Sequence, residues 1–272
     1  MAKTIFITGA SRGFGKIWAE AFLKRGDNVV ATARNIASLN DLTEKYGDAV
    51  LPIQLDVNNK ADGVAAVQQA KAKFGSIDVL INNAGYGLFG TIEETTEQQA
   101  REQFETNVFG LLWVTQAVLP VMREQGHGHI IQVSSVLGIT TLPTLGIYNA
   151  SKFAVEGLSE TLAAEVKGFG IKVSLIEPNG FSTEWAGPSA SQTEAIPAYD
   201  GVKAAFREGL SDDSWGNPDA TVDAVLKLVD SENPPLRLFL GKVAYPWVKQ
   251  VYADKLATWE EWKDVAAAAH GH

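Results

Sequence analysis

The feature that most constrains the fold is an alternation of short apolar runs, rich in β-branched residues, with longer helical patterns. Such an alternation is typical of β-α-β units, in which helices join parallel strands and cover the faces of one sheet. Several runs are apolar almost throughout, as expected for strands buried on both faces. The runs cover residues 4–7, 29–32, 51–55, 79–81, 130–133, 173–176 and 236–240. The pattern predicts an α/β fold with a doubly wound, seven-stranded parallel sheet and helices on both faces.

Three long segments between these runs have helical patterns. Residues 13–25 follow a glycine turn and end at Gly26, a typical helix C-cap. Residues 96–124 are amphipathic, and residues 148–168 form a third helical segment. No long linker rich in serine or glycine divides the chain. We therefore expect residues 1–272 to form a single domain.

Two segments interrupt the alternation. Residues 181–216 are rich in serine, glycine, proline and tryptophan, which predicts a substrate loop over a site. Residues 243–272 form an extension that carries five aromatic residues: Tyr245, Trp247, Tyr252, Trp259 and Trp262. We expect this extension to pack on the domain, since aromatic side chains gather in cores and interfaces. A partner surface and a wall of a substrate pocket are the alternatives.

Composition and charge exclude several classes of function. The net charge of −9 argues against a nucleic-acid partner, because such proteins carry a basic surface. The absence of cysteine excludes disulfides, thiol nucleophiles and cysteine-based zinc sites. No stretch reaches the roughly 18 apolar residues of a membrane span, and the first residues read as a strand rather than a secretory signal. We expect a cytoplasmic protein with no membrane partner.

A few charged or histidine pairs receive ordinary interpretations. His127 and His129 flank Gly128, but no third ligand is evident nearby, so we expect a polar turn and no metal site. The pairs Glu93-Glu94 and Glu260-Glu261 are expected to be charged surface.

The first strand leads into a glycine-rich turn at residues 8–15. Its glycines allow positive φ angles and a close approach of the backbone to a pyrophosphate. The helix that follows would direct free N–H groups and its positive dipole end at that phosphate. The residues of this turn that we expect to bind a dinucleotide are Gly9, Ser11, Arg12, Gly13, Phe14 and Gly15.

The spacing T-G-x-x-x-G-x-G in this turn resembles that of the short-chain dehydrogenase/reductase family. Further motifs follow in the family's order between about residues 3 and 185: Asp56-Val57, Asn82-Asn83-Ala84-Gly85, Asn107, Ser135, and Tyr148 with Lys152 four residues on. Ser135 precedes Tyr148 by the family's thirteen residues. The resemblance implies a Rossmann-type fold and an oxidoreductase of the carbonyl reductase or alcohol dehydrogenase type.

The resemblance assigns catalytic roles to Asn107, Ser135, Tyr148 and Lys152. Ser135 would hold the substrate oxygen, Tyr148 would exchange a proton with it as general acid and base, and Lys152 would also bind the nicotinamide ribose. Asn107 would anchor a water in the proton relay. Tyrosine ionises near pH 10, so a nearby ammonium is needed to favour its phenolate. Tyr148 and Lys152 share a helix face, and lowering the pKa by about 3 units requires about 4 kcal/mol.

The family's cofactor contacts also map onto this chain. They are Asp56, Val57, Asn83, Ala84, Gly85, Tyr148, Lys152, Pro178, Phe181 and Thr183. The chain departs from the family where Asn179 follows Pro178 in place of the usual glycine. Asparagine tolerates left-handed backbone angles better than most residues, so we expect the turn to be kept.

The end of the second strand indicates which nicotinamide binds. Dehydrogenases that use NAD have an acidic residue here, which bonds the adenosine ribose. This chain has Ala33 at that position, followed by Arg34, and Arg12 lies in the glycine turn. Two cations without a carboxylate favour a 2′-phosphate, and therefore NADP(H).

The substrate pocket is expected beyond the carboxyl ends of the strands. Its expected lining is Tyr86, Leu137, Leu142, Leu145 and Trp185, with Leu88 and Phe181 also facing it. This apolar lining favours a lipophilic or aromatic ketone, aldehyde or alcohol. An NADP(H)-binding redox sensor without efficient turnover is the alternative. The family resemblance further implies a homodimer or homotetramer, paired through residues 96–124 and 148–168.

Overall fold

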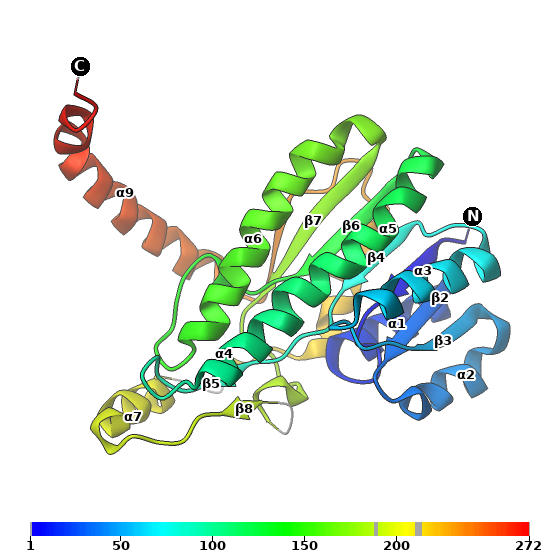
Figure 1. The fold of residues 1–272 in the computed structure, drawn as a ribbon, viewed down its shortest axis with the longest axis horizontal. Coiled ribbons are helices and arrows are strands. Elements are labelled where there is room, and N and C mark those ends of the chain that lie inside the picture. The colour runs from blue at the N-terminus through cyan, green and yellow to red at the C-terminus, as the bar shows by residue number, and fades with distance from the viewer. Residues whose placement is uncertain (1, 188–189, 210–213, 272) are drawn as a thin grey trace.

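A computed structural model describes residues 2–187, 190–209 and 214–271. Its main sheet has seven parallel strands in the order β3-β2-β1-β4-β6-β7-β9 (Figure 1). The predicted doubly wound sheet is therefore confirmed. The strands are β1 Thr4–Ile7, β2 Asn28–Ala33, β3 Val50–Gln54, β4 Val79–Asn82, β6 Gly128–Val133, β7 Ile171–Pro178 and β9 Arg237–Leu240. A separate two-stranded sheet pairs β5 (Leu88–Phe89) with β8 (Ser191–Gln192).

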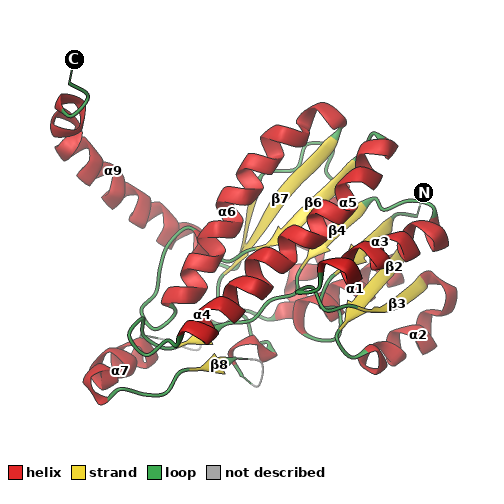
Figure 2. Cartoon of the chain, viewed as in Figure 1, coloured by secondary structure: helices red, strands yellow, loops and turns green. Residues whose placement is uncertain are grey.

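Helices cover both faces of the main sheet (Figure 2). They are α1 Gly13–Arg25, α2 Asn40–Tyr46, α3 Lys60–Phe74, α4 Glu97–Phe104, α5 Leu111–Gln125, α6 Gly146–Val166, α7 Asp200–Glu208, α8 Val222–Asp230 and α9 Ala244–Ala268. Alternate residues of β1 divide between two cores. Ile5 and Ile7 pack with α1 and α8, whereas Phe6 packs with α3 and α5. This alternation explains why the strand is apolar throughout.

The helix predicted over residues 96–124 is interrupted. A π-helical turn, η3 (Glu105–Gly110), separates α4 from α5. The turn places Gly110 so close to Val57 that a Cβ at residue 110 would lie 2.7 Å from a Val57 methyl carbon. Single π turns occur within α-helices most often at functional sites, and this one carries Asn107.

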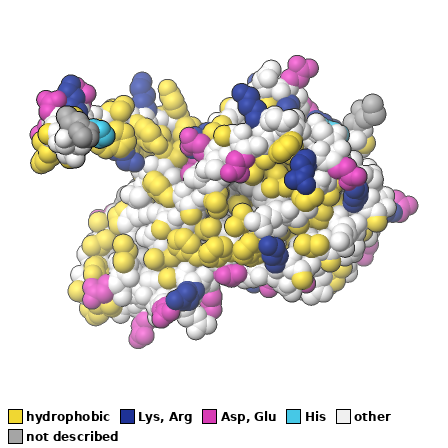
Figure 3. Space-filling model, turned by 45° about the horizontal axis from the view of Figure 1, so that its top comes forward, with side chains coloured by type: hydrophobic (Ala, Val, Ile, Leu, Met, Phe, Trp, Pro, Cys, Tyr) yellow, Lys and Arg dark blue, Asp and Glu magenta, His cyan; other side chains and the backbone are white. Residues whose placement is uncertain are grey.

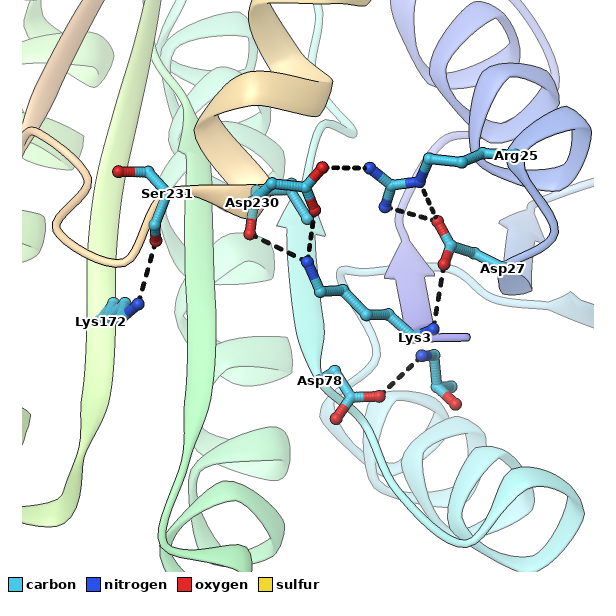
Figure 4. Close-up of polar contacts among 9 residues, drawn as sticks. Lys3, Arg25, Asp27, Asp78, Lys172, Asp230 and Ser231 are labelled. Carbon is cyan, nitrogen blue, oxygen red and sulfur yellow. Dashed lines mark hydrogen bonds and ion pairs between the residues drawn. The ribbon is translucent and has the colours of Figure 1, made fainter. Parts of the chain in front are cut away.

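Charged residues brace the amino-terminal end of the sheet (Figure 4). Arg25 contacts Asp27 and Asp230, and Lys3 pairs with Asp230 as well. The carboxylate of Asp78 accepts a hydrogen bond from the N–H of Thr4 at 2.7 Å. These contacts join α1, β1 and α8 at the end of the sheet opposite the carboxyl ends of the strands.

The expectation of a polar turn at the two histidines is wrong for His129. This residue lies in β6, is buried, and has its Nε2 3.0 Å from the Ser174 Oγ. Burial lowers the pKa of His129 to about 4. At Gly128, the first residue of β6, a Cβ would lie 2.4 Å from the Met122 side chain of α5, so glycine allows the strand and the helix to approach closely.

Helix α9 projects away from the rest of the fold (Figure 1). Only Ala244 and Val248 are buried among its described residues. Trp259 and Trp262 are each 60% exposed, and hydrophobic side chains are visible along the arm in Figure 3. The expectation that residues 243–272 pack on the domain is therefore wrong beyond the first turns of α9. In the described part of the chain, no helix combines the length and apolar character needed to cross a membrane.

Candidate active site

A cavity of about 1100 Å³ lies at the carboxyl ends of the strands. It brings together nearly all the residues that the sequence predicted for a site. Those lining it are Gly9, Ser11, Arg12, Gly13, Phe14, Arg34, Asp56, Val57, Asn83, Ala84, Gly85, Tyr86, Ser135, Leu137, Leu142, Leu145, Tyr148, Lys152, Pro178, Phe181, Thr183 and Trp185. Gly15, Leu88 and Asn107 lie outside the lining, and Leu88 is buried beneath it.

The glycine turn forms a backbone cradle at one end of the cavity. Gly9 and Gly13 have φ angles of 68° and 51°, which glycine adopts readily. A Cβ on Gly15 would lie 2.2 Å from the Gly9 oxygen and 2.5 Å from the Asn83 Nδ2. The first turn of α1 follows directly and directs its N–H groups toward this end. The cradle therefore fits the pyrophosphate of a dinucleotide.

Asn83 and Thr8 hold the cradle in place. The Asn83 Nδ2 donates hydrogen bonds to the backbone oxygens of Thr8 and Gly9 at 3.1 and 3.0 Å. In return, the Thr8 Oγ1 accepts from the N–H groups of Asn83 and Ala84 at 2.9 and 3.0 Å. The N-N-A-G segment after β4 thus positions the turn after β1, two elements that are distant in sequence.

Tyr148, Ser135 and Lys152 meet in the middle of the cavity. Ser135 lies in the loop after β6, close enough to Tyr148 to lower the pKa of its phenol, and its Oγ accepts from the N–H of Leu137 at 3.1 Å. Lys152 lies one helical turn after Tyr148 in α6. Its Nζ donates to the Val133 oxygen at 2.8 Å and lies 5.7 Å from the centre of the Tyr148 ring. All three side chains are buried.

Burial dominates the protonation of this group. It raises the pKa of Tyr148 above the ordinary value of 10, although the hydrogen bond from Ser135 acts in the opposite direction. Burial also lowers the pKa of Lys152 to about 8. Both shifts favour the neutral form of a side chain that leaves water. In the chain alone, burial therefore favours the protonated phenol of Tyr148.

Asn107 lies directly behind this group. Its Nδ2 donates to the Tyr86 oxygen at 3.0 Å and to the Ser151 Oγ at 3.2 Å, and its Oδ1 accepts from the Tyr86 N–H at 3.1 Å. A Cβ on Gly85 would lie 3.1 Å from the Asn107 Oδ1 and 3.9 Å from the Lys152 Nζ. Asn107 therefore joins the π turn, the loop after β4 and the helix that carries Tyr148.

The end of β2 has the character that the sequence predicted. Ala33 is buried, and Arg34 is exposed at the cavity rim. Arg12 extends from the glycine turn, where its Nη1 lies 3.4 Å from the Glu184 Oε2. Both partners in this ion pair are about half exposed, so it is weak and either one can exchange it for another partner.

Asn179 keeps the turn after β7 by a different route from the one expected. Among the described residues other than glycine, Thr144 has a positive φ and Asn179 does not. Instead, the Asn179 Nδ2 donates to the Gly180 oxygen at 2.8 Å, and its side chain occupies the space beside Gly241. The expectation of a left-handed asparagine is therefore wrong.

Aromatic side chains form the other end of the cavity. The Trp185 ring lies 4.9 Å from the Tyr148 ring and 5.4 Å from the Phe89 ring, measured between centroids. Gly87 admits this indole, because a Cβ at residue 87 would meet it at 2.5 Å. The sequence interpretation missed Phe89, Phe206, Val243 and Trp247, which also line this end. The aromatic tail was a signal for Trp247, since a pocket wall was one of its three interpretations.

Glu94 contradicts its interpretation as charged surface. Its side chain is fully buried and accepts hydrogen bonds from residues 91 and 196, among others. Nothing in the local sequence distinguishes it from its exposed neighbour Glu93, because its partners come from a segment about a hundred residues later.

A phosphate cradle and a buried acid–base group share one cavity at the ends of a doubly wound sheet. This arrangement is that of a dinucleotide-dependent oxidoreductase. The chain belongs to the short-chain dehydrogenase/reductase family, since the family model described as short chain dehydrogenase matches residues 3–194. The resemblance noted from the motifs is thereby confirmed.

Full-length relatives agree with this assignment. The chain is 40% identical to the oxidoreductase BOA17 of Botryotinia fuckeliana, over 99% of this chain and 100% of the relative. It is 38% identical to a 3-ketodihydrosphingosine reductase of Bacteroides thetaiotaomicron, over 94% of this chain and 92% of the relative. The crystal structure of a short-chain dehydrogenase from Streptomyces avermitilis superposes with a TM-score of 0.90 at 38% identity, covering 98% of both chains.

Solved relatives also contain nicotinamide cofactors. A family member from Burkholderia cenocepacia was solved with NADP, with a TM-score of 0.73 and 27% identity over 96% of this chain and 97% of that one. One from Burkholderia phymatum was solved with NAD, with a TM-score of 0.80 and 27% identity over 94% and 95%. The cofactor class of this oxidoreductase is therefore a nicotinamide dinucleotide.

Proposed function

We propose that this protein is an NADP(H)-dependent carbonyl reductase or alcohol dehydrogenase that acts on lipophilic or aromatic substrates. One observation carries the proposal: Ser135 and Lys152 meet at Tyr148 inside the cavity that also contains the glycine cradle. This arrangement supports the proposal, because a proton donor, an oxygen-binding hydroxyl and a cofactor must all reach one small molecule.

The chain's own residues orient the substrate and move the proton. The chemistry supplied by a bound reduced nicotinamide is hydride transfer to the carbonyl carbon. Ser135 holds the substrate oxygen, and the Tyr148 hydroxyl donates its proton to that oxygen. Burial favours the protonated phenol of Tyr148, which is the form that can donate. Lys152 would hold the ribose, and Asn107 would fix the water that returns the proton.

The preference for NADP(H) follows from charge at the end of β2. Arg34 and Arg12 both line the cavity, and Ala33 at the end of β2 provides no carboxylate. An arginine fork matches a phosphate in geometry and in charge. The loose contact of Arg12 with Glu184 leaves its guanidinium available for the 2′-phosphate.

The substrate class follows from the aromatic end of the cavity. Leu137, Leu142, Leu145, Phe89 and Trp185 offer few polar contacts besides the reacting group itself. A pocket of this kind selects by shape and apolar area. The relative that reduces 3-ketodihydrosphingosine, a long-chain ketone by its name, supports a lipophilic carbonyl as the substrate.

A redox sensor that binds NADP(H) without efficient turnover is the competing function. The complete set of Asn107, Ser135, Tyr148 and Lys152 favours the enzyme, because binding the cofactor does not require a buried proton donor beside an oxygen-binding serine.

The decisive experiment measures NADPH and NADH oxidation with aliphatic, aromatic and steroid-like carbonyls. We expect turnover with at least one apolar carbonyl and a preference for NADPH. Tyr148→Phe keeps the ring but removes the proton, so kcat should fall by about a hundredfold or more while the NADPH Kd stays within about twofold. Tight NADPH binding without turnover on any carbonyl would establish the sensor instead.

A further inference from the structure

The helix α7 is held against the substrate end of the cavity by little apolar packing. None of its described residues is fully buried. Nevertheless, Phe206 packs against the apolar cluster that contains Leu137 and Tyr148, and it lines the cavity. Some other interaction must therefore fix α7, because burial on this scale stabilises a short helix only weakly.

The Glu94 carboxylate supplies that interaction. Its Oε1 accepts hydrogen bonds from the N–H of Ile196 at 2.7 Å and from the Nζ of Lys203. Its Oε2 accepts from the Thr91 N–H at 2.9 Å and from the Thr193 Oγ1 at 3.3 Å. One carboxylate thus joins the loop after β5 to two points on the segment that leads into α7 and to one point in α7 itself. Lys203 precedes Phe206 by three residues, so both lie on one face of the helix.

The electrostatics of Glu94 match this role. The N–H of Ile196, and next the Lys203 ammonium, lower the pKa of Glu94 to about 2. The carboxylate therefore remains ionised at neutral pH although its side chain has no exposed surface. Buried charges persist when they are both paired and hydrogen-bonded, and Glu94 meets both conditions.

The loop that carries Glu94 is itself fixed to the start of α6. Gly90 donates its N–H to the Thr144 oxygen at 2.8 Å, four residues before Tyr148. A Cβ on Gly90 would lie 2.0 Å from the Thr193 Oγ1, so only glycine lets the two segments meet so closely. Direct contacts therefore connect Phe206 in α7, through the segment before α7 and the loop after β5, to the residues that precede Tyr148.

We propose that Glu94 is a positioning residue, which acts through Lys203 to hold α7 and Phe206 against the substrate and so determines substrate affinity. This inference deepens the proposed carbonyl reductase function, and it rests on that function for its kinetic readout alone. The position of α7 is a property of the chain without substrate, and the rate of tryptic cleavage measures it independently of turnover.

The test compares Glu94→Gln, Lys203→Met and the double variant with the wild type. Glu97→Gln is the matched control, since Glu97 is exposed and, within the described part of the chain, forms its ion pair with Arg101 of its own helix. Three quantities are measured: KM and kcat with the best apolar carbonyl, the Kd of NADPH, and the rate of tryptic cleavage after Arg207, an exposed residue of α7.

We expect Glu94→Gln to raise KM by about tenfold, with kcat and the NADPH Kd within about twofold, and to accelerate cleavage after Arg207. Lys203→Met should have a larger effect, because it leaves a carboxylate buried without its cation, and adding Glu94→Gln should relieve part of that loss. Glu97→Gln should match the wild type in every measurement.

Two results would overturn the proposal. One is an unchanged cleavage rate after Arg207 in Glu94→Gln, which decides the matter even if the protein turns over no carbonyl. The other is accelerated cleavage with a parallel loss of kcat, of NADPH affinity and of thermal stability, since that combination describes general unfolding rather than positioning.

Discussion

Arg34 illustrates how much a single residue at a strand end determines. It follows Ala33, where a carboxylate would have bonded the ribose of NAD, and it lies exposed at the cavity. The Arg34 side chain does not contribute to the hydrophobic core, which the neighbouring residues of β2 already fill. Its proposed role concerns the cofactor alone, and it is therefore well suited to a substitution test.

We expect Arg34→Asp to weaken NADPH binding by about tenfold to a hundredfold, because a charge-assisted contact with the 2′-phosphate is lost and a repulsion gained. NADH binding should change little or improve. Fluorescence titration with both cofactors measures the shift. Arg123→Asp makes the same change of charge at the far end of α5 and serves as the control. An equal loss for both cofactors would contradict the assignment.

Residues with fixed local spacing could be predicted from the sequence. Gly9 and Gly13 are recognisable because a tight turn needs them, and Tyr148 and Lys152 because one helical turn separates them. Glu94 could not be recognised, since its burial depends on partners about a hundred residues away. The pKa directions at the catalytic group were equally inaccessible, because they depend on how deeply α6 is buried.

At the scale of elements, a buried acidic cluster joins α6, β7 and β9. Glu177 is fully buried in β7, and both of its carboxylate oxygens lack a hydrogen-bond partner with suitable geometry. Glu156 of α6 approaches it, and the Arg237 guanidinium of β9 lies 3.0 Å from Glu156 and 3.4 Å from Glu177. Burial, and then the charge of Glu156, raise the pKa of Glu177 well above its ordinary 4.5.

This raised pKa predicts a loss of stability with increasing pH. Above pH 4.5 the unfolded chain releases the Glu177 proton while the folded protein still retains it, so the folded state loses stability until its own pKa is passed. Glu177→Gln removes this titrating group. The difference in free energy of unfolding between the variant and the wild type should therefore grow in favour of the variant by up to about 1.4 kcal/mol per pH unit above 4.5.

Urea unfolding of both proteins at several pH values from 5 to 9 provides the measurement. Glu160→Gln is the control, because Glu160 contacts the same Arg237 from an exposed position. If the Glu177→Gln and wild-type curves run parallel across this range, the two buried carboxyl groups do not retain a proton.

Element boundaries show where sequence patterns stop being informative. The α1 range of Gly13–Arg25 matches its prediction because a glycine turn begins the helix and Gly26 ends it. The π turn in the predicted long helix left no comparable signal, since its apolar spacing continues through the interruption. The π turn depends on tertiary contacts, since residues 105–110 must fit against Val57 and bring Asn107 to Tyr86.

For the whole molecule, we propose that exposed apolar side chains on α6 and η3 form the contact between copies of this chain. Phe153 and Leu158 on α6 are 40% and 37% exposed, and Phe109 of η3 is 40% exposed and stacks on Trp113. The resemblance to the family predicted a homodimer or homotetramer paired through residues 96–124 and 148–168, which include these side chains. Covering such side chains provides the apolar area that association needs.

We expect the wild type to elute as a dimer or tetramer, and Leu158→Glu to shift it toward the monomer without unfolding it, since the side chain is accessible in a single chain. Light scattering after size exclusion measures the mass, and circular dichroism verifies the fold. Lys227→Glu, on α8 across the sheet, provides a control for added negative charge. A monomeric wild type would exclude this interface.

The cavity has two ends that are constructed differently. The cofactor end consists of backbone held by Thr8 and Asn83, whereas the substrate end consists of aromatic side chains on short peripheral elements. The hydrogen bonds between Thr8, Gly9, Asn83 and Ala84 that hold the cradle do not involve Phe89 or Trp185. During evolution, a chain of this kind can therefore acquire new substrates by altering its loops while its nucleotide chemistry is inherited intact.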